Sequence, residues 1–378
     1  MLTVHCSNRF EVLADRVADR VASRVGMHAA NPFTPDHLVV PSAAIQRALR
    51  LHLANKHGIS ANLNFAFLAQ WLWARVAAVV PQVQSDSPYA AQRLGWRLHG
   101  LLKEGDWIQD HPRLARYLHA CDALMRHDLA MQLGGRFEQY TTYRPDWLAG
   151  WEQGHLALQG AAHAPSVKED ERWQAALWRS LQEQIGATGF DPVGRFIETV
   201  TSTSPEAWQA MGQPAQVQLV ALSGMPPQHA RMLAALGEVM DVHVHVMNPC
   251  QEYWFDLVDA RRLRHLGRKA EGAGFEVGHP LLAAWGRQTQ SQLGVLVDAF
   301  ADRFDDEGAY RRHQSPSLLA ALQNSILELS PLEPGSLPPA HGDTSIEIHA
   351  CHSLSRQLEV LHSRLLSAFA ERDSTLTP

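Results

Sequence analysis

The chain has 378 residues, of which 46% are hydrophobic and 19% are charged. These values are ordinary for a globular protein and exclude an intrinsically disordered chain, and a net charge of −6 excludes a basic protein that coats DNA indiscriminately. The four cysteines have no C-x-x-C spacing and no apolar run approaches the roughly 18 residues of a membrane span, so we expect a reduced, cytoplasmic protein without a membrane partner.

Two distant segments share the pattern of a strand that runs through a polar turn into a helix. In the first, residues 2–8 precede a helix with apolar residues at Phe10, Leu13, Val17, Val21 and Val25, which is a helical period. In the second, residues 345–353 precede a helix with Leu358, Leu361, Leu365 and Phe369 on one face. A strand, a turn and a helix in this order hold phosphate in nucleotide-binding proteins. Two such units suggest the paired halves of a helicase motor.

The chemistry of that motor is missing from the sequence. A Walker A loop needs a lysine followed by Ser or Thr, whereas each of the four lysines, Lys56, Lys103, Lys168 and Lys269, is followed by another residue type. No apolar strand ends in an Asp-Glu pair for magnesium, and no lysine lies two residues after a carboxylate, as a restriction-type nuclease core requires. We therefore expect no catalytic site and no cofactor in this chain.

Between these units, further strands alternate with helices. Strands are predicted at 38–40, 217–222 and 242–246, joined by helices, which is typical of a parallel sheet. The helix that Ser42 opens should end at Gly58. From about residue 66 to 211 helical periodicity dominates, and nine of the eleven tryptophans fall there. We interpret the charged run at 168–172 (Lys-Glu-Asp-Glu-Arg) as a solvated helix start.

The predicted fold class is therefore α/β, with a helical domain inserted into a domain built on a parallel sheet. Residues 1–65 and 212–330 are assigned to the first domain, with helical additions after 250, and residues 66–211 to the insertion. Residues 331–344, rich in proline, are assigned to a linker, and residues 345–378 to the beginning of a second domain. Because half a domain cannot close a core, we expect this sequence to be part of a longer protein.

Several motifs, in this order and spacing, resemble the RecC family, the gamma subunits of bacterial exodeoxyribonuclease V. They are Met1–Arg9, Gly58–Asn62, Tyr143–Leu148, Asn248–Cys250, His279–Gly286 and Cys351–Ser353. The resemblance covers the whole chain, which corresponds to the N-terminal third of the family's members. It implies a superfamily 1 helicase-like (P-loop NTPase-like) fold that has lost its ATPase motifs.

The resemblance also implies a role in repair of DNA double-strand breaks by recombination. In the family, this subunit scaffolds the RecB and RecD helicase subunits, in which ATP and magnesium act. It splits forked DNA, guides the emerging 3′ single strand through a tunnel and recognises the Chi signal there. The chain would thus be a subunit of an ATP-dependent exonuclease and helicase without a catalytic site of its own.

By the same resemblance, the residues expected to line the tunnel are Phe67, Trp73, Glu138, Gln139 and Arg144. Trp73 could stack on a base, or it could be a core residue, since Trp71 and Trp73 cannot both face inward on one helix. Pro145 disfavours helix at Arg144, so the Arg144 guanidinium group should project from a loop towards phosphate or guanine. The alternative for Arg144 is an ion pair with Asp146 or Glu152.

The sequence departs from the family pattern in two places. The helix after the second strand contributes Pro41, Ser42, Ala43 and Arg47, where the family commonly presents small amide and hydroxyl donors towards DNA. Gly135 and Arg136 stand where an acidic and an apolar residue are more usual. Arg47 and Arg136 change the donor pattern that reads bases, so a different signal, or none, would be recognised. The basic residues are nearly all arginine, which binds phosphates and bases bidentately, although a GC-rich genome explains the same bias.

Two classes of function remain open. The first is a non-catalytic subunit that guides single-stranded DNA, for which Arg47, Gln139, Arg144 and Trp73 should converge on one channel. The second is an assembly scaffold for partner subunits without specific DNA contact. His243 and His245 alternate on one strand without further ligands at metal spacing, and we interpret them as strand-face residues rather than a metal site.

Overall fold

A computed structural model describes residues 1–25, 33–84, 86–103, 106–160, 162–186, 191–258, 276–300, 303–305, 309–330 and 342–370. By contacts it divides into two compact units, Met1–Pro249 with Ala284–Arg311, and Cys250–Ala283 with Arg312–Pro378. The predicted linker falls largely at 331–341, outside the described residues. Among the described helices, none combines the length and the hydropathy that crossing a membrane requires.

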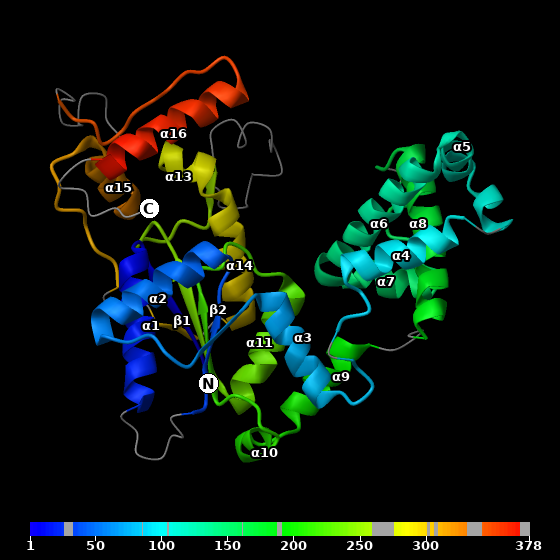
Figure 1. Ribbon diagram of the computed structural model, residues 1–378, viewed down its shortest axis with the longest axis horizontal. Helices are drawn as coiled ribbons and strands as arrows, with labels where there is room; N and C mark the ends of the chain where they lie inside the picture. The colour runs from blue at the N-terminus through cyan, green and yellow to red at the C-terminus, as the bar shows by residue number, and fades with distance from the viewer. Residues whose placement is uncertain are drawn as a thin grey trace. The chain divides into compact units, whose positions relative to one another are not determined.

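The first unit contains a parallel sheet, to which the strands labelled β1 and β2 in Figure 1 belong. Its strand order is β3-β2-β4-β5-β1-β8. Its strands are β1 (Leu2–Ser7), β2 (Asp36–Val39), β3 (Leu63–Ala66), β4 (Gln216–Val220), β5 (Asp241–Met247) and β8 (Phe304–Asp305). The four predicted strands therefore lie together in one parallel sheet, which confirms the α/β class. Strands β3 and β8 were not predicted, because they have only four and two residues.

Helices pack on both faces of this sheet. Helix α1 (Phe10–Val25) contacts β1 and β5 and packs against α2 (Ala43–His57), and both cover one face. Helix α11 (Pro227–Val239) contacts the same two strands and packs against α14 (Arg287–Phe300). Because side chains alternate along a strand, Leu2, Val4 and Cys6 face away from α1. Gly237 of α11 lies so close to Leu2 that a Cβ atom there would approach the Leu2 Cβ to 2.9 Å.

Helix α2 shows how local sequence sets an element's limits. The Ser42 hydroxyl accepts a hydrogen bond from the Ile45 amide at 3.3 Å and caps the helix at its N-terminus. Gly58 ends it with a left-handed backbone, φ 76°, a conformation that glycine adopts without strain. Leu49 and Leu53 are buried, as their spacing predicted.

The face of the sheet under α1 carries a cluster of histidines. His5 stacks on His245 with ring centroids 5.0 Å apart, and its Nε2 lies 3.4 Å from Nδ1 of His243. Arg16 and Arg20 of α1 reach the same rings, at 2.9 Å from His5 Nδ1 and 3.2 Å from His243 Nε2. Burial, aided by Arg20, lowers the pKa of His243 to about 4. These are strand-face residues, as interpreted, held by arginines and by Gln218, whose Oε1 lies 2.8 Å from His245 Nε2.

Between β3 and β4 the chain is helical, and its larger part forms a core of its own. The helices are α3 (Leu68–Val79), α4 (Ala91–Leu101), α5 (Pro112–Ala120), α6 (Ala123–Tyr143), α7 (Pro145–Glu152), α8 (Pro165–Ile185), α9 (Pro192–Thr201) and α10 (Pro205–Ala210), with a 3-10 turn at Asp106–Asp110. Trp151, Trp178 and Phe137 are buried in the core that α4 to α8 share. Helices α4 and α6 pack closely because Gly134 presents no Cβ to the Ala91 carbonyl.

One interpretation of the helical segment was wrong. Glu171, within the charged run assigned to solvent, is 2% exposed and accepts hydrogen bonds from Trp151 Nε1, Gln159 Nε2 and the amides of Ala157 and Leu158. Its position on α8 turns it inward, where these four donors compensate the burial of its charge.

The second unit contains the short parallel pair β6 (Leu257–Val258) and β7 (Glu276–Val277), with α15 (Leu318–Leu327) and α16 (Leu354–Ala370); α13 (Pro280–Trp285) begins in it. The strand predicted at 345–353 is wrong, because these residues form no regular element and Ile348 is 92% exposed. A strand needs a neighbour for its backbone groups, and no described strand lies beside this segment. The helix predicted after it is confirmed as α16, although none of its residues is buried.

Candidate nucleic-acid interface

The turn after β1 has the place of a phosphate-binding loop, and the chain itself occupies its polar groups. The Ser7 hydroxyl donates to the Ala309 carbonyl at 2.7 Å and accepts from the Arg9 amide. The Asn8 amide group donates to the Arg311 carbonyl at 2.9 Å, while the Arg311 amide donates to Asn8 Oδ1 at 3.0 Å. The segment 309–311 thus engages the polar side chains of this turn, a contact that could not be predicted because it joins residues about 300 positions apart in the chain.

We expect this turn not to bind ATP, because its hydrogen-bonding side chains are engaged and no lysine is present to neutralise phosphate. Isothermal titration of the chain with ATP and magnesium should give no saturable heat. Binding in the micromolar range that Asn8→Ala abolishes would contradict this prediction.

Arg47 and Phe67 lie near the carboxyl ends of the neighbouring strands β2 and β3, the edge at which open parallel sheets bind ligands. Arg47 is exposed on the first turns of α2, and among the described residues its guanidinium has no ion pair. Phe67 precedes α3 in an extended conformation and is 52% exposed. A free cation and an exposed ring are thus placed at one edge of the sheet.

Trp73 is half-buried on α3, and its indole Nε1 donates to the Gln84 carbonyl at 3.1 Å. Its neighbour Trp71 takes the inward position at 3% exposure and donates to His37 Nδ1. The structure therefore selects Trp71 as the core residue of the pair and leaves part of the Trp73 ring accessible.

The other expected residues belong to α6. Arg136, Glu138 and Gln139 are exposed, and Arg136 Nη1 donates to Gln139 Oε1 at 3.2 Å. Phe137 between them is fully buried, so the helix holds these three side chains on its outer surface. This hydrogen bond joins two of the residues that are expected to contact DNA.

Arg144 lies between α6 and α7, with the non-helical backbone that Pro145 predicted (φ −139°, ψ 49°). The alternative of an ion pair is wrong within the described residues: Glu152 accepts a hydrogen bond from Trp178 Nε1, and Arg144 pairs with neither carboxylate. Instead, the guanidinium carbon lies 5.5 Å from the centroid of the Trp147 ring, and Nη1 donates to the Tyr143 carbonyl. The stacking orients the fork and leaves the side chain exposed.

The expected residues thus form two groups, one on α2 and α3 and one on α6 and its C-terminus. Among the described residues, no hydrogen bond or ion pair joins one group to the other. Their convergence on one channel stays a prediction.

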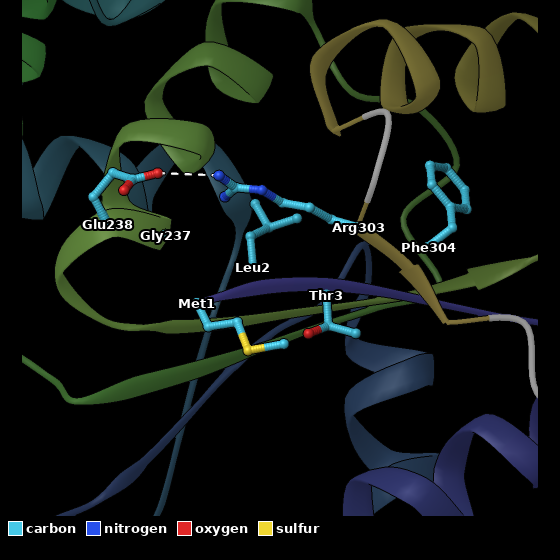
Figure 2. A pocket seen from close by; sticks show the side chains of 7 residues that line it. All are labelled: Met1, Leu2, Thr3, Gly237, Glu238, Arg303 and Phe304. Carbon is cyan, nitrogen blue, oxygen red and sulfur yellow. Dashed lines mark hydrogen bonds and ion pairs between the residues drawn. The ribbon is translucent and has the colours of Figure 1, made fainter.

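A hollow of about 470 Å³ lies at the amino end of β1, opposite the turn that contains Ser7 and Asn8 (Figure 2). Figure 2 shows the Arg303 guanidinium pointing to Glu238, with which it forms an ion pair at 3.1 Å. The two charges of this ion pair neutralise each other, and the hollow lies away from the edge where parallel sheets bind ligands. Arg303 is therefore a cation remote from the candidate interface.

Comparison with known proteins gives consistent matches. The family model described as RecC, N-terminal domain, matches residues 2–329. The chain is 33% identical to the RecBCD enzyme subunit RecC of Escherichia coli, over 100% of this chain and 36% of the relative. It is 28% identical to that of Haemophilus influenzae, over 92% and 35%, and 26% identical to that of Mycolicibacterium smegmatis, over 100% and 32%. The chain therefore spans about a third of the length of these curated relatives.

Proposed function

The chain belongs to the RecC family, and from this premise we propose that it guides single-stranded DNA as a non-catalytic part of a helicase–nuclease. The relatives are named as subunits of the RecBCD enzyme, so the proposed partners are RecB and RecD, with ATP and magnesium bound there. The parallel sheet would be a helicase-like domain without its motor, serving DNA repair and recombination.

The observation that carries this proposal is the exposure of two cations and an aromatic ring, together with a turn after β1 whose polar side chains are already engaged. The turn after β1 is occupied by residues 309–311, whereas Arg47, Phe67 and Arg144 remain exposed. Single-stranded DNA is held by cations along its backbone and by aromatic faces on which bases stack. The arrangement therefore suits a single DNA strand that is bound and guided.

Recognition of a Chi-type signal is the finer part of the proposal. Arg136, Gln139 and Arg144 offer donors and acceptors that base edges can pair with, while Arg47 and Arg136 differ from the family pattern. We propose that these two arginines alter which bases are preferred.

Arg47 tests the proposal in the full assembly with its partner subunits. Arg47→Gln should weaken binding of a DNA fork with a 3′ single strand, because one phosphate contact is lost. The slope of log affinity against log salt should fall by about 0.7 for a single strand. Arg303→Gln at the opposite sheet edge should change neither quantity. If the slope is kept but base preference changes, Arg47 reads bases instead; if neither changes, this edge does not contact DNA.

A specific observation favours the scaffold alternative. Helix α16 exposes Leu354, Leu358, Leu361 and Leu365 on one face, and each is at least 46% exposed. Exposed apolar faces of this kind are covered either by a partner protein or by further parts of the same chain, and the relatives extend well beyond the region that this chain matches. If this face binds a partner subunit, Leu361→Asp should prevent assembly, whereas Arg47→Gln should leave assembly and DNA binding intact under a pure scaffold role.

A further inference from the structure

The outer face of α2 carries positive charge without a compensating carboxylate. The helix has no Asp or Glu, and Lys56 at its end is paired with Asp15 and Asp19 at 3.0 and 2.8 Å. Arg47 and Arg50 have no ion pair or hydrogen bond among the described residues, and both are exposed. Residues three apart on a helix are neighbours on its surface, so these two guanidinium groups form a short cationic row.

An aromatic ring holds the second of these guanidinium groups in place. The Arg50 guanidinium carbon lies 5.0 Å from the centroid of Phe65. Phe65 belongs to β3, the strand at the edge of the sheet. Stacking of this kind orients the planar fork and leaves its N–H edge available to an anion.

Phe67, which directly follows β3, provides a second aromatic ring. Phe65 and Phe67 are two residues apart, and the backbone at Phe67 is extended (φ −85°, ψ 149°), so both rings lie on one side of the chain. Phe67 is 52% exposed. The exposed Phe67 ring and two cations therefore line the boundary between α2 and β3, whereas the Phe65 ring is partly buried beneath Arg50 and against the core.

Beside Arg50 the surface is hollowed, with a volume of about 610 Å³. The hollow is lined by Arg50, Leu51, Ala54, Gly58, Ile59, Ser60, Asn62 and Leu63, none of them acidic. Leu51 and Ile59 are 53% and 68% exposed, so its walls offer apolar surface next to a cation. An apolar surface next to a cation is complementary to a nucleotide, in which a flat base is joined to a phosphate.

We infer that the face between α2 and β3 binds single-stranded DNA, with Arg50 as a phosphate contact beyond Arg47. The inference rests on the proposed function and extends it. The bound DNA strand continues from Phe67 and Arg47 along α2 into the hollow. Unstacked bases fit here because the exposed Phe67 ring and the apolar hollow accept base faces, which a duplex keeps covered. An acidic peptide shares only the charge complementarity and leaves the Phe67 ring without a partner.

The test uses the full assembly and oligothymidylate 3′ overhangs of increasing length, with affinity measured against salt. Arg50→Gln should abolish the gain in affinity that longer overhangs give, a loss of roughly tenfold, and lower the salt slope by about 0.7. Arg50→Lys should keep the slope and lose part of the affinity, because a lysine does not stack flat on Phe65. Arg303→Gln is the matched control and should bind as the wild type. Arg50 is exposed, so its replacement should leave the melting temperature unchanged.

The outcomes separate this inference from the proposed function. If Arg47→Gln weakens binding and Arg50→Gln does not at any overhang length, the extended path is wrong and the proposed function stands. If neither variant weakens binding, both fail. If Arg50→Gln leaves DNA binding intact but releases a partner subunit, an acidic protein segment covers this face and the inference is overturned.

Discussion

Replacing Arg144 with Ala should blunt the response of the assembled enzyme to its recombination signal while leaving unwinding and digestion near normal. Arg144 is held by the Trp147 ring at 5.5 Å and makes no ion pair among the described residues, so its loss removes a donor fork without exposing a buried charge. A bidentate contact between arginine and a base contributes about 1–3 kcal/mol of discrimination. The proposed motors lie in other subunits, so strand separation should not depend on it.

The measurement compares, in one reaction, the rate of unwinding and the fraction of unwound molecules that respond to the signal. Arg144→Lys separates base reading from phosphate binding, because lysine keeps the charge and loses the planar fork. Arg113→Ala is the matched control, since Arg113 is a half-exposed arginine in the same helical region, paired with Asp170 at 3.0 Å. Equal loss of unwinding and signal response in Arg144→Ala would make Arg144 structural and favour the scaffold role.

The parallel sheet was predictable because its main strands carry strong local signals. Strands β1, β4 and β5 are apolar and follow or precede clear helices, and Ser42 and Gly58 mark the ends of α2 by capping chemistry that acts within a few residues. Strand β3, with only four residues, has no such signal. The segment 345–353 has the pattern of a strand, but pattern alone does not supply the neighbour that its backbone needs.

The candidate site was predictable one residue at a time, and its environment was not. Pro145 correctly indicated a loop at Arg144, and the helical period correctly indicated that only one of Trp71 and Trp73 faces inward. The occupation of the Ser7–Asn8 turn by residues 309–311 depends on contacts between segments at opposite ends of the unit. The stacking of Arg50 on Phe65 likewise joins a helix to a strand that the sequence analysis did not find.

Replacing Glu171 with Gln should destabilise the helical region more than any surface change. Glu171 is 2% exposed, and its carboxylate accepts hydrogen bonds from two side chains, Trp151 and Gln159, and two backbone amides. A glutamine keeps the volume but turns an amide group towards these donors and leaves some of them unpaired. The free energy of unfolding should fall by about 2–4 kcal/mol. Denaturation by urea, followed by tryptophan fluorescence, measures this loss.

Glu183→Gln on the same helix is the control, because Glu183 is exposed, and it should lie within about 0.5 kcal/mol of the wild type. The effect of Glu171→Gln should also depend on pH. Burial alone would raise the pKa of Glu171, but its hydrogen bonds outweigh burial and lower the pKa below 4.5. A carboxylate with a lowered folded pKa stabilises the fold above its unfolded pKa, and this contribution is lost as the pH falls through the folded pKa. The difference between wild type and Glu171→Gln should therefore be full at neutral pH and shrink below about pH 4.5; a difference independent of pH would show that the carboxylate's charge contributes nothing.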